Sequence, residues 1–205
     1  MLYFSFIIPK INEKMGIWFS ASLRPPPTAP SVNLIKYTGG GKPEGKTWYC
    51  IWHLPQFYQP VEAINTSATY TLNLDRPDPR IKVVNRMQLP VPFSHEYRDV
   101  WIEGVAMPDK FYHNDFAKLL VSFQPTPSSP IVGPPNAPYW ILMLDEQNYS
   151  YAVVSDPQRH TLWILSATPY LDDVTVAFIW KTLVEVHGFT TTQIHMLHQT
   201  VHTTV

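Results

Sequence analysis

The stretch YSYAVVSDPQRHTLWILSATP, residues 149–169, contains two short runs that are rich in β-branched and aromatic residues. The runs cover residues 149–155 and 161–166, and the Asp156-Pro157 pair between them is typical of a turn. Thr168-Pro169 ends the second run, because a proline restricts the backbone of the residue before it. The stretch therefore predicts two neighbouring β-strands followed by a break.

Six similar runs precede this stretch along the chain. They cover residues 48–54, 66–74, 81–88, 100–107, 117–123 and 139–144. Eight runs at short spacing, with no helical segment between them, predict an antiparallel meander. Eight is also about the number of strands at which a closed barrel can hold one small ligand. The predicted fold class is all-β, an eight-stranded antiparallel up-and-down barrel.

One helix is predicted after this break. Asp172 or Asp173 offers the side-chain oxygen of an N-cap, and Gly188 suits the left-handed residue that follows a helix. The apolar residues of the segment cover about half of the helix surface, and we expect that half to pack on the barrel. They are Val176, Ala177, Ile179, Trp180, Leu183, Val184 and Val186.

Two apolar residues of the helix, Val174 and Phe178, fall among its polar residues and indicate a contact with a partner on the outer face. A short final strand is expected within residues 193–199. The predicted domains are an N-terminal extension over residues 1–44, the barrel over residues 45–199 and a tail over residues 200–205. The extension carries a Pro-rich arm at residues 24–30, and a second Pro-rich segment, residues 124–138, is predicted to be one long loop.

Composition limits the classes of function. Charged residues make up 15% of the 205 residues, apolar residues make up 45%, and the formal net charge is -1 at pH 7. A charged share below the usual value of about 25% indicates apolar surface beyond an ordinary core, facing a cavity, a partner or a membrane. The near-neutral charge disfavours nucleic-acid binding, which depends on the release of counterions from phosphates.

Cys50 is the only cysteine, so neither an intrachain disulfide nor a Cys-rich zinc site can form. The apolar run at residues 1–8 is too short to span a bilayer and lacks the features of a secretory signal. We therefore expect an intracellular, organellar or membrane-associated protein with no secretory signal and no transmembrane segment.

Three groups of residues carry a family resemblance. Gly45 precedes a strand that opens with Trp48-Tyr49, residues 156–169 end in Thr168-Pro169, and Gly188-Phe189 closes the predicted helix. In this order and spacing the chain resembles the lipocalin family, and within it the branch of the bacterial outer-membrane lipocalin and apolipoprotein D. The resemblance covers residues 45–199 and implies a closed barrel whose cup holds a small hydrophobic ligand.

The chain departs from the family pattern at two positions. Both Lys46 and Thr47 stand between the glycine and the tryptophan, where the family usually has one residue. Ala167 stands where the family has an arginine, which in relatives lies over the tryptophan at the closed end of the barrel. Without that arginine, the closed end is either plugged by the N-terminal extension or looser than in relatives.

The candidate ligand contacts follow from the resemblance and from strand alternation. Trp140 aligns with a tryptophan that lines the cup of apolipoprotein D, and alternation places Trp52 and Cys50 on the same face as Trp48. Further candidates on neighbouring strands are Tyr70, Asn85 and Trp101. Four residues, Gly45, Trp48, Thr168 and Pro169, are interpreted as structural.

Catalytic and metal chemistry find little support. His195, His198 and His202 lie close together, but alternation on a strand points the first two to opposite faces, and no cysteine or nearby carboxylate completes a metal site. The chain has no G-x-S-x-G motif, and no base is evident for Cys50. We predict a protein that is not an enzyme, with no catalytic residue, no metal ligand and no cofactor.

Two functions remain open. The first is non-enzymatic binding or transport of a small hydrophobic ligand, such as a fatty acid, a lysophospholipid, a sterol or a pigment-like molecule. The alternative is a structural accessory subunit of a large assembly, possibly membrane or viral. It would contact protein partners through residues 1–44, the 124–138 loop and the outer helix face. Peripheral membrane contact is a further expectation.

Overall fold

The computed structural model describes residues 29–73, 79–112, 115–129 and 134–203. Eight strands and one longer helix account for most of the described chain, and four short elements complete it. The elements are α1 (Leu34–Tyr37), β1 (Lys46–His53), β2 (Ile64–Asn73), β3 (Arg80–Pro90), β4 (Tyr97–Pro108), the 3-10 helix η1 (Lys110–Tyr112), β5 (Lys118–Gln124), β6 (Ala137–Leu144), β7 (Tyr151–Ser155), β8 (Leu162–Ser166), α2 (Asp173–Glu185), α3 (Thr191–His195) and β9 (His198–Gln199).

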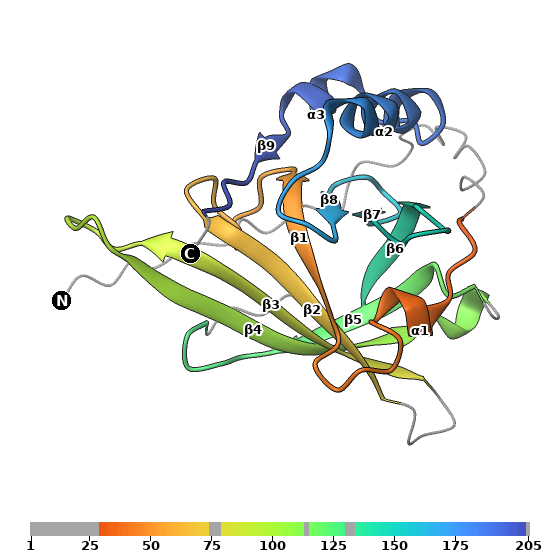
Figure 1. Cartoon of the computed structure of the whole chain (residues 1–205), viewed down its shortest axis with the longest axis horizontal. Coiled ribbons are helices and arrows are strands. Elements are labelled where there is room, and N and C mark those ends of the chain that lie inside the picture. Colours follow the sequence, from red (N-terminus) through yellow and green to blue (C-terminus); the bar gives the residue numbers. More distant parts are fainter. Residues whose placement is uncertain (1–28, 74–78, 113–114, 130–133, 204–205) are drawn as a thin grey trace, which may run out of the picture.

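The strands form a closed antiparallel barrel. Each strand from β2 to β7 pairs with the next one along the chain, and β1 pairs with both β2 and β8. The second pairing of β1 joins the two edges of the meander, and no edge remains open between these eight strands. Figure 1 shows β1 to β8 around a common interior, with α2 and α3 together on one side. The predicted up-and-down barrel with a C-terminal helix is confirmed.

The predicted final strand is partly wrong. The structure has only the two-residue strand β9 in that region, and a short helix, α3, precedes it. Thr190 caps α3, because its hydroxyl accepts from Gln193 N at 3.1 Å while the Gln193 side chain accepts from Thr190 N at 3.0 Å. This reciprocal capping box favours a helical turn over an extended chain.

Helix α2 begins and ends as predicted. The carboxylate of Asp172 accepts from Thr175 N at 2.9 Å, and Gly188 has a φ of 70° just beyond the helix. The surface that packs on the barrel is narrower than the predicted half, because only Ile179 and Leu183 of the helix are buried. The predicted packing residues Ala177 and Val186 are exposed. The helix therefore contacts the barrel mainly through Ile179 and Leu183, with the half-buried Trp180 and Val184 packed beside them.

A second set of core residues lies between the barrel and its C-terminal helices. Some of the buried side chains of β7 and β8 pack there with those of α2 and with Phe189 and Ile194. Val174 and Phe178 are exposed, as the sequence predicts. The barrel therefore has two separate apolar regions, one inside it and one beneath α2.

One end of the barrel is plugged by α1, which belongs to the segment that the sequence assigns to the N-terminal extension. Asn33 caps this helix through its side-chain oxygen, and Leu34 and Tyr37 are buried in the interior core cluster. The ring of Tyr37 lies 5.1 Å from the ring of Trp48, whose Nε1 donates to the backbone oxygen of Tyr37 at 3.1 Å. Of the two alternatives for this end, the structure shows the plug.

Lys46 lies over Trp48 where the family resemblance implies an arginine. Its Nζ is 4.1 Å from the centroid of the Trp48 ring and donates to the backbone oxygen of Tyr149 at 2.6 Å. The contact is a cation–π interaction, which contributes about 0.5–2 kcal/mol depending on how far the pair is desolvated. Lys46 thus supplies the cation over Trp48 that the arginine supplies in relatives, where this chain has Ala167.

Gly45 is required by its backbone conformation and by its surroundings. Its φ is 73°, and a Cβ at this position would overlap the backbone oxygen of Tyr70. The chain turns here from α1 into β1, so any other residue would push β1 away from β2.

Some expectations for the ends of the chain fall outside the described residues. These are most of the Pro-rich arm at residues 24–30, part of the long loop, and the end of the predicted tail. Within the described residues, Val32, Leu34 and Tyr37 pack with residues of the barrel core. The packed unit thus begins before the predicted boundary at Gly45. None of the helices in the described part of the chain is long and apolar enough to cross a membrane.

Candidate functional site

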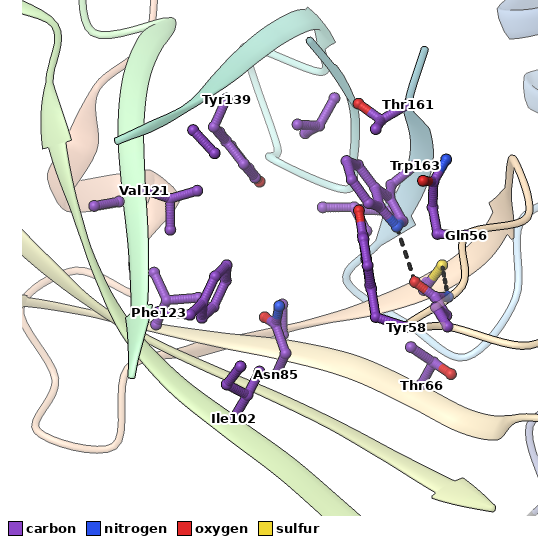
Figure 2. A pocket seen from close by; sticks show the side chains of 18 of the residues that line it. Gln56, Tyr58, Thr66, Asn85, Ile102, Val121, Phe123, Tyr139, Thr161 and Trp163 are labelled. Carbon is purple, nitrogen blue, oxygen red and sulfur yellow. Dashed lines mark hydrogen bonds between the residues drawn. The ribbon is translucent and has the colours of Figure 1, made fainter. Parts of the chain in front are cut away.

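The barrel encloses a cavity of about 460 Å³. This volume lies within the range of about 300–1,000 Å³ that is typical of sites for small molecules. Aliphatic side chains of β3, β4, β5 and β7 supply much of its wall, together with aromatic rings from several strands. The apolar part of the lining includes Ala68, Ile81, Val83, Val100, Ile102, Ala106, Leu119, Val121, Phe123, Val154 and Leu165. Figure 2 shows the side chains of Val121 and Phe123 at this wall.

Three tyrosines meet in the cavity at the end that α1 plugs. Tyr37 comes from α1, Tyr70 from β2 and Tyr139 from β6, and all three line the cavity. The Tyr139 hydroxyl lies 3.0 Å from the Tyr37 hydroxyl and 2.7 Å from the Tyr70 hydroxyl. Burial raises the pKa of all three phenols above the usual value. The three groups therefore stay protonated and neutral at physiological pH.

A series of hydrogen bonds between side chains lies in the cavity wall beside β8. Trp163 Nε1, whose bond is a dashed line in Figure 2, donates to Gln59 Oε1 at 2.9 Å, and Gln59 Nε2 donates to Cys50 Sγ at 3.6 Å. Burial raises the pKa of the Cys50 thiol to about 11. The thiol therefore stays protonated near neutral pH and is a poor nucleophile, since the thiolate is the reactive form.

Charged side chains of the lining lie at its edge. They are Arg86, Asp156 and His160, of which Arg86 and His160 are exposed. Asp156 accepts hydrogen bonds from Thr161 N at 2.6 Å and from Gln158 N at 3.0 Å, within the turn between β7 and β8. The interior of the cavity is thus lined by apolar groups and uncharged polar groups.

Comparison with known proteins places the chain in a family. A family model described as a lipocalin-like domain matches residues 32–199. Temperature-induced lipocalin-1 of Arabidopsis thaliana is 35% identical over 168 residues, which are 82% of this chain and 80% of the relative. The chain is a lipocalin.

Solved structures agree with this lipocalin at the level of the fold. Insecticyanin from the tobacco hornworm Manduca sexta has a TM-score of 0.56 at 17% identity and matches 85% of this chain and 86% of its own. H1 crustacyanin from the lobster Homarus americanus has a TM-score of 0.52 at 17% identity, over 88% of this chain and 91% of its own. The closer resemblance to the bacterial and apolipoprotein D branch stays a prediction.

Three of the predicted ligand contacts line the cavity of this lipocalin. They are Tyr70, Asn85 and Trp101, and Asn85 points into the pocket in Figure 2. The backbone oxygen of Trp101 accepts from the hydroxyls of Thr126 and Ser128, at 2.6 and 2.9 Å. These bonds attach the start of the loop after β5 to the barrel wall.

Trp52 lies outside the barrel, and the alternation argument for it is wrong. Its ring packs edge-on against Trp180 of α2, with the ring centroids 5.4 Å apart. The register of β1 on β8 shifts between Cys50 and Trp52, because a bulge adds one residue there. A one-residue shift exchanges the two faces of a strand. Cys50 therefore faces the cavity and Trp52 faces the helix.

Trp140 is not among the described residues that line the cavity. Its ring lies 5.4 Å from the Tyr112 ring and 5.2 Å from Lys118 Nζ. The neighbouring residue, Tyr139, faces the interior instead, and so does Ile141 two positions further on. The strand alternates as expected, and the family alignment selects the wrong one of two adjacent aromatic residues.

The lining residues that sequence reasoning missed include Tyr37, Tyr139, Gln59 and Trp163, whose side chains form the hydrogen bonds described above. Tyr37 gave no signal, because it lies in the segment assigned to the extension. Tyr139 could have been found by testing both phases of the strand that contains Trp140. Trp163 lies in the motif at residues 156–169, which was used only to predict strands and to identify the family resemblance. Gln59 lies in a loop, where strand alternation gives no prediction.

Of the three C-terminal histidines, His198 and His202 contact the C-terminal half of β1, while His195 is the last residue of α3. The ring of His198 lies edge-on to the ring of His53, and His202 Nε2 lies 2.9 Å from the backbone oxygen of Cys50. Thr200 Oγ1 lies 3.4 Å from His53 Nδ1. Each of these side chains is held by the contacts of β9 and the chain after it with β1.

The stability of the fold should fall as the pH falls from about 6.5 to about 4. Burial lowers the pKa of His53 and of His187 to about 4 in the folded chain. The unfolded chain titrates near the ordinary value of about 6.5, and it binds more protons than the folded chain between these pH values. The two histidines therefore leave stability unchanged above about pH 6.5, and they lower it as the pH falls from there toward 4. Urea unfolding across this range measures the slope.

His53→Gln/His187→Gln should flatten this slope, because it removes the two imidazoles that the unfolded chain protonates more readily than the folded chain. A profile of the double variant as steep as that of the wild type would contradict the assignment.

Proposed function

We propose that this lipocalin binds and carries a small hydrophobic ligand in its barrel cavity, without changing it chemically. The ligand class is a fatty acid, a lysophospholipid or a similar elongated apolar molecule. The observation that carries the proposal is the closed barrel with a cavity of about 460 Å³ whose interior is mostly apolar.

The driving force follows from that lining. An apolar ligand that leaves water gains roughly 25 cal/mol for each Å² buried, and a preformed cavity requires little reorganisation of the protein. The plug of α1 and the cation of Lys46 hold one end shut, so a ligand enters from the end that carries Gln56, Tyr58 and the turn at residues 156–161.

A carrier also needs no reactive group, and the cavity supports that view. Its only thiol, Cys50, has a pKa raised to about 11, and Tyr58 at the mouth has a pKa raised to about 12 by burial and by Asp156. These groups are poor nucleophiles and poor bases at neutral pH.

Added palmitate should quench the fluorescence of tryptophans that line the cavity. Trp101 and Trp163 line it, whereas Trp52 and Trp140 lie elsewhere in the fold. We expect Trp101→Phe/Trp163→Phe to lose the response and the matched pair Trp52→Phe/Trp140→Phe to keep it. The measurement is a fluorescence titration, with organic extraction and mass spectrometry of the purified protein beside it. A wild-type protein that neither responds nor yields a lipid-like molecule would remove the proposal.

The accessory-subunit alternative has one supporting observation among the described residues, the exposed Val174 and Phe178 on α2. The two side chains are one helical turn apart, which suits a contact with another protein. In the other expected contact segments, residues 1–28 and 130–133 lie outside the described residues. Val174→Ser/Phe178→Ser would test the alternative, since an accessory subunit should then lose its partners from a purified assembly.

A further inference from the structure

The tyrosine trio has more donors than it uses. Tyr37, Tyr70 and Tyr139 carry three hydroxyl protons, and two oxygen-to-oxygen contacts join the three groups, at 3.0 and 2.7 Å. Each contact uses one proton, so one hydroxyl of the trio always keeps a proton with no acceptor inside the trio. Rotation of the hydroxyls lets any of the three carry that proton.

The trio faces the cavity. All three side chains line it, and Figure 2 shows the Tyr139 ring reaching inward with its oxygen toward the centre. A buried donor without an acceptor is unfavourable, and a ligand oxygen placed at the trio would remove that cost. Because the pKa of each phenol is raised, the trio offers a neutral donor and not a charge.

Two further polar atoms of the lining lack a partner. Asn85 Oδ1 and Thr66 Oγ1 are buried, and neither has a hydrogen bond within the described part of the chain. Both residues line the cavity, and the Asn85 amide points into it in Figure 2. An amide oxygen accepts a hydrogen bond from a hydroxyl, whereas it repels a carboxylate.

Among the described residues that line the cavity, none places a cation in the interior that could compensate for a buried anion. Arg86 and His160 are exposed at the edge of the lining, and Asp156 adds a negative charge there. Moving an ionised carboxylate into an apolar interior without a paired charge is far more costly than moving an ester or an alcohol.

We propose that the α1 end of the cavity binds the uncharged oxygen-bearing group, a carbonyl or a hydroxyl, of an otherwise apolar ligand. The tyrosine trio donates the hydrogen bond, and within the proposed ligand class the cavity favours such a neutral group over the ionised head of a free fatty acid, which it binds more weakly. This inference rests on the proposed function, because it specifies the ligand class of the same cavity.

The test is competitive loading with ligands that share one chain. The full-length protein is incubated at pH 8 with an equimolar mixture of methyl palmitate, palmityl alcohol, palmitate and hexadecane. It is then freed of excess ligand and extracted, and the four species are quantified by mass spectrometry. We expect the ester and the alcohol to be enriched over hexadecane by about fivefold, the effect of one neutral hydrogen bond. Palmitate should be enriched less than either of them.

The matched variant is Tyr37→Phe/Tyr70→Phe/Tyr139→Phe. It removes three oxygens from one site and keeps the rings, and replacing all partners of a buried polar group with similar shapes is close to neutral for stability. We expect the variant to bind hexadecane as well as the wild type does and to lose the enrichment of the ester. Tyr49→Phe removes a hydroxyl from a strand residue that is not part of the lining, and it should keep the enrichment.

The outcomes separate the two proposals. Equal loading of ester, palmitate and hexadecane, or an unchanged preference in the triple variant, would overturn the inference while the carrier function stands. Failure of all four probes to load would remove the carrier function and the inference together. Circular dichroism of each variant confirms that the barrel has formed.

Discussion

Trp48→Ala is expected to lower the free energy of unfolding by about 3–5 kcal/mol, the range for removal of a large buried aromatic side chain. Trp48 is 0% exposed and stands where three elements meet. Its removal leaves a cavity beneath α1, and the Tyr37 backbone oxygen loses its 3.1 Å hydrogen bond. Lys46 loses the ring that its ammonium group covers.

This loss is a large part of the total stability of a domain, which is about 5–15 kcal/mol. Urea unfolding followed by circular dichroism measures it. Phe178→Ala is the control, because Phe178 is 53% exposed and its truncation should change stability by no more than about 0.5 kcal/mol. A loss of less than about 1 kcal/mol for Trp48→Ala would show that the ring does not hold the plugged end together.

Val121→Trp is expected to weaken ligand binding about fiftyfold. Val121 is buried and lines the cavity, so an indole ring at this position occupies space that a ligand needs. Displacing about three methylene groups of the ligand, at about 0.8 kcal/mol each, gives a loss of this size. The fold should survive with a penalty of about 1–3 kcal/mol from overpacking.

Val105→Trp is the matched control for this variant. Val105 lies on the neighbouring strand β4 and is 39% exposed, so the same added ring points away from the cavity. Fluorescence titration with palmitate and mass spectrometry of extracted ligand compare the two variants. Equal affinities for Val121→Trp and the wild type would place the ligand outside the barrel.

The elements of the fold could be predicted because their signals are local. Runs such as residues 149–155 and 161–166 carry the composition of strands, and each observed strand overlaps its predicted run. The ends of α2 were predictable for the same reason, since an N-cap such as Asp172 and a left-handed glycine such as Gly188 act within a few residues. Short-range chemistry of this kind can be read without knowledge of the rest of the chain.

The faces of the strands were predicted less well, because one inserted residue changes them. Trp52 was assigned to the cavity on the assumption of unbroken alternation, and the bulge before it reverses the assignment. Tyr139 and Trp140 present the same difficulty, since the two adjacent rings face opposite sides. Local composition does not distinguish the two phases, and only pairing with the neighbouring strands selects one.

By itself, then, the sequence determined that this chain forms an eight-stranded antiparallel barrel followed by a helix, because strand runs, turns and caps are decided by nearby residues. Only the tertiary structure brought Tyr37, Tyr70 and Tyr139 together and placed Lys46 over Trp48. The trio spans 102 positions between its first and last members. Contacts over such separations depend on how the sheet closes, on its register and on its bulges, and those are properties of the whole barrel.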